Sequence, residues 1–169
     1  MFYKLFETPV WVKKINPARI NLKSKNFQRS FNSDTPTTFG QPQNNEIDKY
    51  GTDYLLDNIL NCLSDLSIKK IGLIEIWRNI YNNDFQERHM HVKSSFSFTV
   101  YEKLKQPQTI FYHPAHDMIY ALALEPYITA TSLPNCSQGD LVVFPSYLEH
   151  SVKRTKDAIT ISGNVRIIE

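Results

Sequence analysis

The chain contains 169 residues, of which 41% are hydrophobic and 21% are charged, and its formal net charge is +2. This size and composition predict one globular domain spanning residues 1–169, and so small a charge argues against nucleic acid as a partner. No apolar run approaches the roughly 18 residues of a membrane helix, and the first residues, MFYKLFETPVW, lack the pattern of a secretory signal. We therefore expect a cytoplasmic protein without membrane contact, whose two cysteines, Cys62 and Cys136, stay reduced.

Residues 1–69 are expected to support a β core. The segment Lys4–Lys13 is a predicted strand, and Asp48–Leu66 is a predicted amphipathic helix, since leucine and isoleucine recur along it at helical spacing. This apolar stripe should cover a sheet and consists of Leu55, Ile59, Leu63 and Leu66. Between strand and helix, Ser24–Asn45 is polar and aperiodic, which predicts a long loop or partly ordered arm. Such an arm could cover a cavity as a lid, although disorder is the simpler interpretation.

Residues 70–169 have the composition of a β core. Short runs rich in β-branched and aromatic residues alternate with turn signals such as Asn82-Asn83-Asp84 and Gly139-Asp140. Seven runs are predicted strands: IGLIEIW, ERHMHVKSSFSFTVY, QTIFYH, YITATS, DLVVFP, HSVK and AITISGNVRII. Because no helical pattern separates them, they should pair antiparallel in a sandwich, a jelly roll or a small barrel. The predicted fold class is therefore mainly β, with a supporting N-terminal helix.

Two histidines lie near the start of the second predicted strand. Side chains two residues apart leave a strand on the same face, so His89 and His91 can converge on one metal ion. That face continues with polar residues that would meet solvent or line a cavity: Ser95, Ser97, Thr99 and Tyr101. The opposite face is expected to be core: Met90, Val92, Phe96, Phe98 and Val100. A pair of histidines alone is a weak indication of a metal site, so a third ligand is needed.

The strongest candidate for the third ligand is His150. The apolar strand Leu141–Phe144 ends at Pro145-Ser146, and this frame would present His150 at the start of the next extended run. A surface histidine on a turn is an equally simple interpretation. The rival pair, His113 and His116, surrounds a proline in a predicted loop and is expected at the surface or beside a substrate. Three neutral imidazoles suit Fe(II), Zn, Cu or Ni and leave positions open for oxygen activation.

Four parts of the sequence, in this order, resemble one family. They are LFETPVW (Leu5–Trp11), EIWRNI (Glu75–Ile80), HMHVKSSFSFTVY (His89–Tyr101), and GDLVVFPSYLEHSV (Gly139–Val152) followed by ITISGN (Ile159–Asn164). Together they resemble a phage and marine-bacterial group of 2-oxoglutarate/Fe(II)-dependent oxygenases, members of the double-stranded β-helix (jelly-roll) superfamily. The resemblance covers nearly the whole chain. It implies a double-stranded β-helix, and a location in the host cytoplasm if the protein is phage-encoded.

The resemblance also implies an iron-dependent dioxygenase. His89, His91 and His150 would be the metal ligands and catalytic residues, with Fe(II) as cofactor and 2-oxoglutarate and dioxygen as co-substrates. The reaction would convert 2-oxoglutarate to succinate and carbon dioxide and would hydroxylate an unidentified substrate. In the wider superfamily the middle ligand is usually Asp or Glu, so His91 departs from the pattern. Three imidazoles leave the full charge of the divalent ion, which favours a dianionic chelator.

A second departure concerns the co-substrate. Members of the family tend to place an arginine at the start of the last strand, where it grips the distal carboxylate of 2-oxoglutarate. Ala158 occupies that position here, and Lys156 or Arg154 would have to reach the carboxylate instead. Ser162 and Asn164 share the face of Ala158 and are candidates to line the same cavity. The residues expected to bind the co-substrate are Tyr101, Tyr112, Lys156 and Asn164.

Two alternative functions stay open from the sequence. The first is a cupin-like metalloprotein that uses three histidines without 2-oxoglutarate. The second is a non-catalytic jelly roll, such as a virion or assembly component, which the missing arginine would permit. An exposed edge strand would also permit a homodimer.

Overall fold

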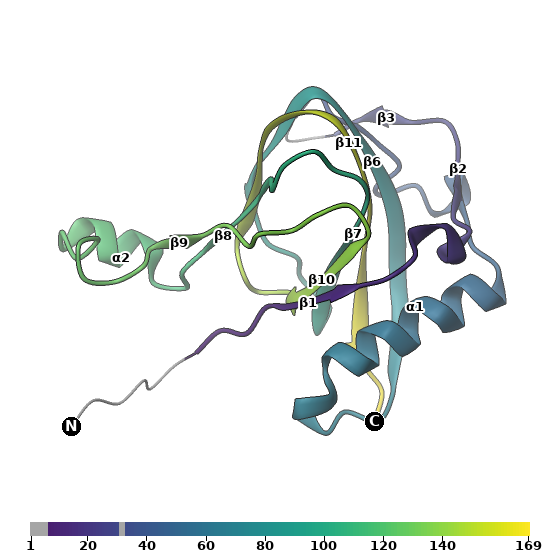
Figure 1. Cartoon of the computed structure of the whole chain (residues 1–169), viewed down its shortest axis with the longest axis horizontal. Coiled ribbons are helices and arrows are strands. Elements are labelled where there is room, and N and C mark those ends of the chain that lie inside the picture. The colour runs from purple at the N-terminus through teal and green to yellow at the C-terminus, as the bar shows by residue number, and fades with distance from the viewer. Residues whose placement is uncertain (1–6, 31–32) are drawn as a thin grey trace.

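A computed structural model describes residues 7–30 and 33–169 and shows a mainly β protein (Figure 1). Its strands are β1 (Trp11–Lys14), β2 (Lys23–Ser24), β3 (Gln28–Arg29), β4 (Pro36–Thr37), β5 (Asn45–Glu46), β6 (Ile71–His89), β7 (Phe96–Lys103), β8 (Thr109–Tyr112), β9 (Thr131–Ser132), β10 (Asp140–Pro145) and β11 (His150–Ile167). Its α-helices are α1 (Lys49–Cys62) and α2 (His116–Ala121), and short 3-10 helices occupy Pro17–Ile20, Pro42–Asn44 and Ser64–Leu66. The predicted N-terminal strand is shorter than expected. It begins at Trp11, and residues 4–6 lie outside the described part of the chain.

The predicted support helix forms as α1. Asp48 caps its first turn, because the Asp48 carboxylate accepts a hydrogen bond from the backbone amide of Gly51 at 2.6 Å. The stripe residues Leu55, Ile59 and Leu63 are fully buried and pack in one cluster with residues of β7, β10 and β11. The predicted stripe therefore covers the sheet, except at Leu66, which lies beyond the helix and is 43% exposed.

The main sheet is antiparallel and curls on itself. Its strand order is β1-β10-β7-β11-β6-β4-β3, and β8 pairs with β11 and β9. β11 pairs with β6 along its length, while its first residues also pair with β8 and its later residues with β7. The strands therefore curve round a common centre, with α1 on the outside (Figure 1). This arrangement confirms the predicted double-stranded β-helix.

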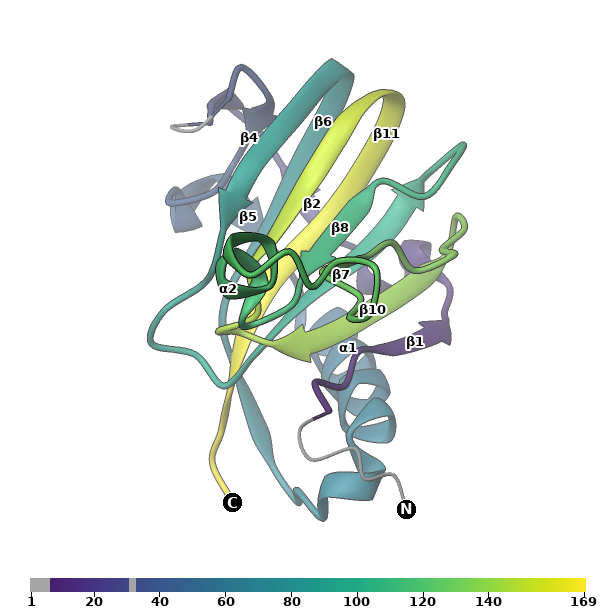
Figure 2. The ribbon, with the colours of Figure 1, turned by 90° about the vertical axis from the view of Figure 1, so that its left-hand side faces the viewer.

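The two longest strands are more continuous than predicted (Figure 2). HSVK and AITISGNVRII form a single strand, β11, and IGLIEIW extends within β6 as far as His89. The predicted turn at Asn82-Asn83-Asp84 does not end β6. Asn83 has φ 78°, Asp157 in β11 has φ 56°, and the register of the two strands shifts in this region. Register shifts of this kind are typical of β-bulges, which bend and twist paired strands, so both strands continue round the roll.

The segment from Glu87 to Tyr101 is less regular than predicted. β6 ends at His89 and strand structure resumes only at Phe96, so one continuous strand is a wrong prediction. Met90 and Val92 are exposed, because they lie in the irregular connection and not on the inner face of a strand. The later part of the prediction is correct, since Phe96, Phe98 and Val100 are buried.

The region between β8 and β10 also differs from the prediction. YITATS contains only the two-residue strand β9, and the six-residue helix α2 occupies part of a predicted loop. This region projects from the roll (Figure 1). A short helix without a wide apolar stripe gives little periodic signal in the sequence.

The polar arm Ser24–Asn45 is joined to the main sheet through β3 and β4, and its ends pair with each other as β2 and β5. β4 pairs with β6 at Thr37 and Asn79, and the Thr37 hydroxyl donates a hydrogen bond to Asn79 Oδ1 at 2.7 Å. Thr35 and Thr38 are fully buried. Disorder was therefore the wrong interpretation for these residues. Buried threonines anchor the arm through hydrogen bonds, which a hydrophobic pattern does not reveal.

Gly163 lies where β11 closely approaches its neighbours. A Cβ atom at this position would lie 2.4 Å from the Phe98 ring and 2.5 Å from the carbonyl oxygen of Glu75. We expect Gly163→Ala to lower the free energy of unfolding by about 1–3 kcal/mol, the usual effect of overpacking a core. Gly72→Ala is the matched control, because its methyl group would meet the flexible end of Ile168, which is 53% exposed. Urea unfolding compares the two variants, and equal losses would contradict this account.

Candidate metal centre

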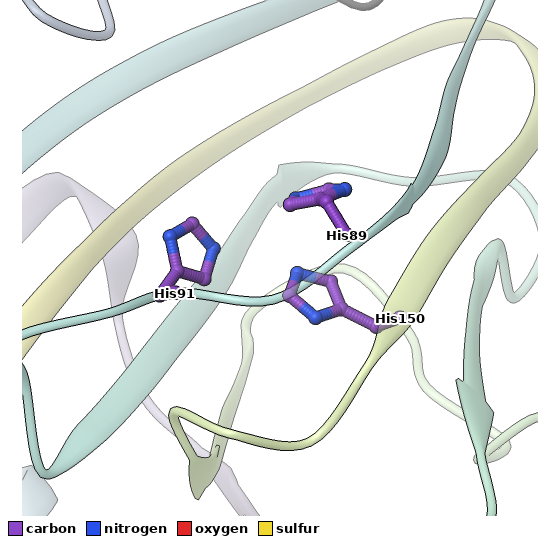
Figure 3. A group of neighbouring side chains, drawn as sticks. All are labelled: His89, His91 and His150. Atoms are coloured by element: carbon purple, nitrogen blue, oxygen red, sulfur yellow. The ribbon is translucent and has the colours of Figure 1, made fainter.

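Three histidine side chains converge inside the roll, as Figure 3 shows. His89 ends β6, His150 begins β11 opposite it in the register, and His91 follows in the connection after β6. One ring nitrogen from each residue lies within 4.8 Å of the others. The ring centroids are 4.3 Å apart for His89 and His150, and 5.3 Å apart for His91 and each of the other two. In the described ranges, no other group of three or more His, Cys, Asp or Glu side chains converges in this way.

Backbone carbonyl groups fix the orientation of two of the rings. His89 Nδ1 lies 2.7 Å from the carbonyl oxygen of Glu87, and His150 Nδ1 lies 3.1 Å from that of Leu148. A carbonyl oxygen only accepts, so each Nδ1 must carry the hydrogen, which leaves the lone pair on Nε2. This is the usual arrangement of a metal-binding histidine, in which one nitrogen is held by the protein and the other faces the ion.

The histidine rings are neutral at ordinary pH. Burial lowers the pKa of His89, and burial together with the neighbouring His89 lowers the pKa of His91 from 6.5 to about 4. His150 is only 6% exposed, and its burial holds its pKa well below 6.5. Neutral imidazole is the form that donates a lone pair to a metal ion. The site is therefore in its metal-binding protonation state without help from a neighbouring base.

These pKa shifts make the metal-free protein sensitive to acid. In the unfolded chain each histidine gains a proton near its ordinary pKa of 6.5, whereas folded His91 stays neutral down to about 4. The unfolded state therefore binds more protons in this window, and the free energy of unfolding should fall as the pH drops below 6.5. Thermal unfolding of chelator-treated protein across this range measures the effect. We expect His91→Leu to show a weaker pH dependence, and an unchanged dependence in this variant would contradict the assignment.

The three histidines line a cavity of about 100 Å³. Its apolar lining includes Phe39, Trp77, Phe98, Phe144 and Val152. Its polar lining includes Asn79, Tyr81, Gln86, Gln108, Thr109 and Thr160. Among the described residues that line the cavity there is no Lys, Arg, Asp or Glu. A metal ion held by the histidines would therefore face a pocket with neutral walls.

The four residues predicted to bind the co-substrate lie outside the lining of this cavity. Tyr101 is 1% exposed, and its hydroxyl is hydrogen-bonded to Thr109 at 2.7 Å. Tyr112 is bonded through its hydroxyl to Ser151 at 2.9 Å, and Lys156 is exposed on β11. Asn164, the fourth, is buried between strands.

Asn164 holds together the strands around the site. Its Oδ1 accepts a hydrogen bond from Ser97 at 2.7 Å, and its Nδ2 donates to Glu75 at 2.6 Å. The hydroxyl groups of Ser97 and Ser146 are 2.9 Å apart, and the carbonyl oxygen of Ser146 accepts from the backbone amide of His91 at 3.0 Å. Asn164 thus belongs to a chain of polar contacts that leads to the backbone of His91.

Ala158 occupies the position at which the family resemblance implies an arginine. It is fully buried and packs against Tyr81 and Val152, both of which line the cavity. Lys156 and Arg154, the two upstream candidates, do not line it. The Arg154 guanidinium donates to the carbonyl oxygen of Asn83 at 2.7 Å, on the outside of the roll.

The rival histidines are separate from the cluster. His113 is exposed, and His116 contacts Asp117 and Arg88. Arg88 also forms ion pairs with Asp117 at 2.9 Å and with Glu149. Arg88 precedes His89, and Glu149 precedes His150. The ion pair between Arg88 and Glu149 therefore joins the two strand ends that carry candidate metal ligands.

The residues that line the cavity could be predicted only in part. Ser162 lines the cavity, as its shared face with Ala158 suggested. Three further lining residues were missed: Thr160 on the same face, Asn79 on β6, and Gln108 just before β8. Alternation along a strand identifies a face, but it does not tell which residues of different strands surround one space.

A curled antiparallel sheet around three converging histidines defines a class of protein, the double-stranded β-helix proteins with a candidate metal centre. Residues 75–164 match the family described as "Putative 2OG-Fe(II) oxygenase", in which 2OG denotes 2-oxoglutarate. The match covers more than half of the chain and includes all three histidines, and the chain belongs to this family.

Solved structures have the same fold. A prolyl-4-hydroxylase of Pseudomonas putida is 14% identical over 96% of this chain and 94% of that chain, with a TM-score of 0.58. HygX of Streptomyces hygroscopicus, determined with nickel, 2-oxoglutarate and hygromycin B bound, is 10% identical over 95% of this chain and 83% of that chain, with a TM-score of 0.58. At these identities the likeness establishes the fold alone.

A search of curated proteins finds no match. No helix in the described ranges has the length and apolar character needed to cross a membrane.

Proposed function

We propose that the protein is a 2-oxoglutarate- and Fe(II)-dependent dioxygenase that hydroxylates a substrate and holds its iron through His89, His91 and His150. The observation that carries this proposal is the convergence of three neutral imidazoles on one cavity, in a chain of this family. The donor set fits the ion, because imidazole suits Fe(II). Metal–nitrogen bonds of about 2.1 Å would place the three nitrogens roughly 3 Å apart, so the rings would have to move inward from their present separations of up to 4.8 Å.

Iron would supply the activation of dioxygen, coupled to the oxidative decarboxylation of 2-oxoglutarate. The residues of the chain would provide binding and orientation. The carbonyl groups of Glu87 and Leu148 hold two rings with Nε2 free, and His91 lies beside Trp77 at a centroid distance of 5.6 Å. Aromatic and aliphatic side chains, among them Phe39, Phe98 and Phe144, form part of the cavity wall beside the histidines.

A three-histidine metalloprotein that does not use 2-oxoglutarate is the second candidate. One observation favours it: no Lys or Arg lines the cavity among the described residues, so the distal carboxylate of 2-oxoglutarate has no cationic partner there. The two candidates share the metal ligands and differ only in the co-substrate.

Calorimetry with nickel as a redox-inert metal separates these candidates. For a 2-oxoglutarate-dependent enzyme, nickel-loaded protein should bind one 2-oxoglutarate per chain, and metal-free protein should bind none. Metal binding without 2-oxoglutarate binding would overturn the proposal in favour of the second candidate. Failure to retain any metal after anaerobic loading would favour a non-catalytic jelly roll.

A further inference from the structure

The side chain of Gln108 is buried in the histidine-lined cavity without a protein partner. Gln108 is 1% exposed, and within the described part of the chain neither its Nε2 nor its Oε1 has a hydrogen-bond partner. Its backbone is anchored, since its carbonyl oxygen accepts from the amide of Lys153 at 2.9 Å, next to the pairing of β8 with β11. A buried amide left without partners is unfavourable by roughly 1–3 kcal/mol. In native proteins such a group is usually met by a ligand, an ion or an ordered water molecule.

Gln108 differs in this respect from neighbouring polar side chains of the cavity. Asn79 accepts from Thr37 at 2.7 Å and donates to Thr160 at 3.2 Å. The Tyr81 hydroxyl donates to Gln86 at 3.1 Å. These groups are satisfied by the protein itself. A ligand would therefore gain more binding free energy from a hydrogen bond to the Gln108 amide than from one to these satisfied groups.

The charges in the cavity indicate which ligand group this amide would meet. The three histidines are neutral, and none of the other described residues lining the cavity is charged. A divalent ion would therefore bring two positive charges that no described residue of the cavity neutralises. A dianionic chelator would neutralise them, although its distal carboxylate would lie among neutral groups and would need a hydrogen-bond donor.

We propose that the Gln108 amide binds the distal carboxylate of the dianionic 2-oxo acid, with Nε2 donating to a carboxylate oxygen in place of a cationic side chain. This inference rests on the proposed function and adds a co-substrate-binding residue to it. Oε1 would remain able to accept a hydrogen bond from a water molecule. The divalent ion would balance the charge of the dianion, and the Gln108 amide would orient its distal carboxylate.

A comparison of two ligands with two variants tests the inference. Nickel-loaded wild-type protein, Gln108→Leu and Gln106→Leu are titrated calorimetrically with 2-oxoglutarate and with 2-oxovalerate, which lacks the distal carboxylate. Gln106 is exposed in the same loop, so its substitution is the matched control. We expect Gln108→Leu to weaken 2-oxoglutarate binding roughly 10- to 100-fold, as for the loss of a hydrogen bond to a charged group. Binding of 2-oxovalerate should change little, and nickel content should stay the same.

Gln108→Glu gives a second and independent result. It keeps the shape of the side chain and places a negative charge beside the carboxylate, so it should weaken 2-oxoglutarate binding at least as much as the leucine variant. Equal weakening of both ligands by Gln108→Leu, or wild-type affinity in both Gln108 variants, would overturn the inference. If wild-type protein binds nickel but not 2-oxoglutarate, the proposed function itself fails, and this outcome is distinct from the failure of Gln108 alone.

Discussion

Replacing His150 with Ala is expected to abolish stoichiometric metal binding. His150 contributes one of only three candidate ligands, and its ring is held between Phe144, at a centroid distance of 4.8 Å, and His89. Loss of a residue that merely supports a ligand lowers metal affinity by about 10- to 100-fold, so loss of a ligand should cost at least about 100-fold. Metal content after anaerobic loading and desalting, measured by elemental analysis, gives the result.

The control for this variant is His113→Ala. His113 is exposed and lies outside the cluster, so its removal should leave metal content at the wild-type value. Thermal unfolding of the metal-free variants shows whether His150→Ala remains folded. A folded His150→Ala protein with full metal content would contradict the assignment of this ligand.

Replacing His91 with Asp is expected to separate metal binding from co-substrate binding. A carboxylate can serve as a metal ligand, so His91→Asp should retain metal, whereas His91→Ala should lose it. The aspartate adds a negative charge to the site of a dianionic ligand, and two like charges separated by about 5 Å repel by about 3 kcal/mol at an effective dielectric constant near 20. We therefore expect 2-oxoglutarate to bind about 100-fold more weakly to the nickel-loaded aspartate variant.

The reason lies in the balance of charge in the cavity. The wild-type site has neither an acidic ligand nor a lining cation among its described residues, so the ion and a dianion neutralise each other. His91→Asp disturbs this balance by one charge. Calorimetry with 2-oxoglutarate measures the effect, and affinity equal to that of the wild type would show that the charge of the ligand set does not govern co-substrate binding. Full metal content in His91→Ala would instead remove His91 from the set of ligands.

The fold class and the candidate histidines could be predicted from the sequence because both depend on residue patterns within short segments. The alternation around Phe96, Phe98 and Val100 and the apolar run Leu141–Phe144 identify buried strands, and the stripe of α1 identifies its packing face. The sequence placed His89 near the start of a predicted strand, whereas the structure places it at the end of β6; His150 begins β11, as predicted. The register of β6 and β11 brings these two distant residues opposite each other.

Other features depend on contacts that are not local. Asn82-Asn83-Asp84 has the composition of a turn, but pairing with β11 converts it into a bulge. The polar arm is anchored by threonine hydroxyl groups, such as that of Thr37, and not by an apolar pattern. Gln108 is an ordinary polar residue in the sequence, and only the folded structure shows its amide unpartnered beside the histidines.

X-ray diffraction at the absorption edge of the bound metal tests the central claim most directly. Crystals of protein loaded with Fe(II) without air should show one anomalous peak per chain, about 2.1 Å from a ring nitrogen of each of His89, His91 and His150. A peak at His113 and His116, or no peak at the three converging rings in fully loaded crystals, would contradict the account.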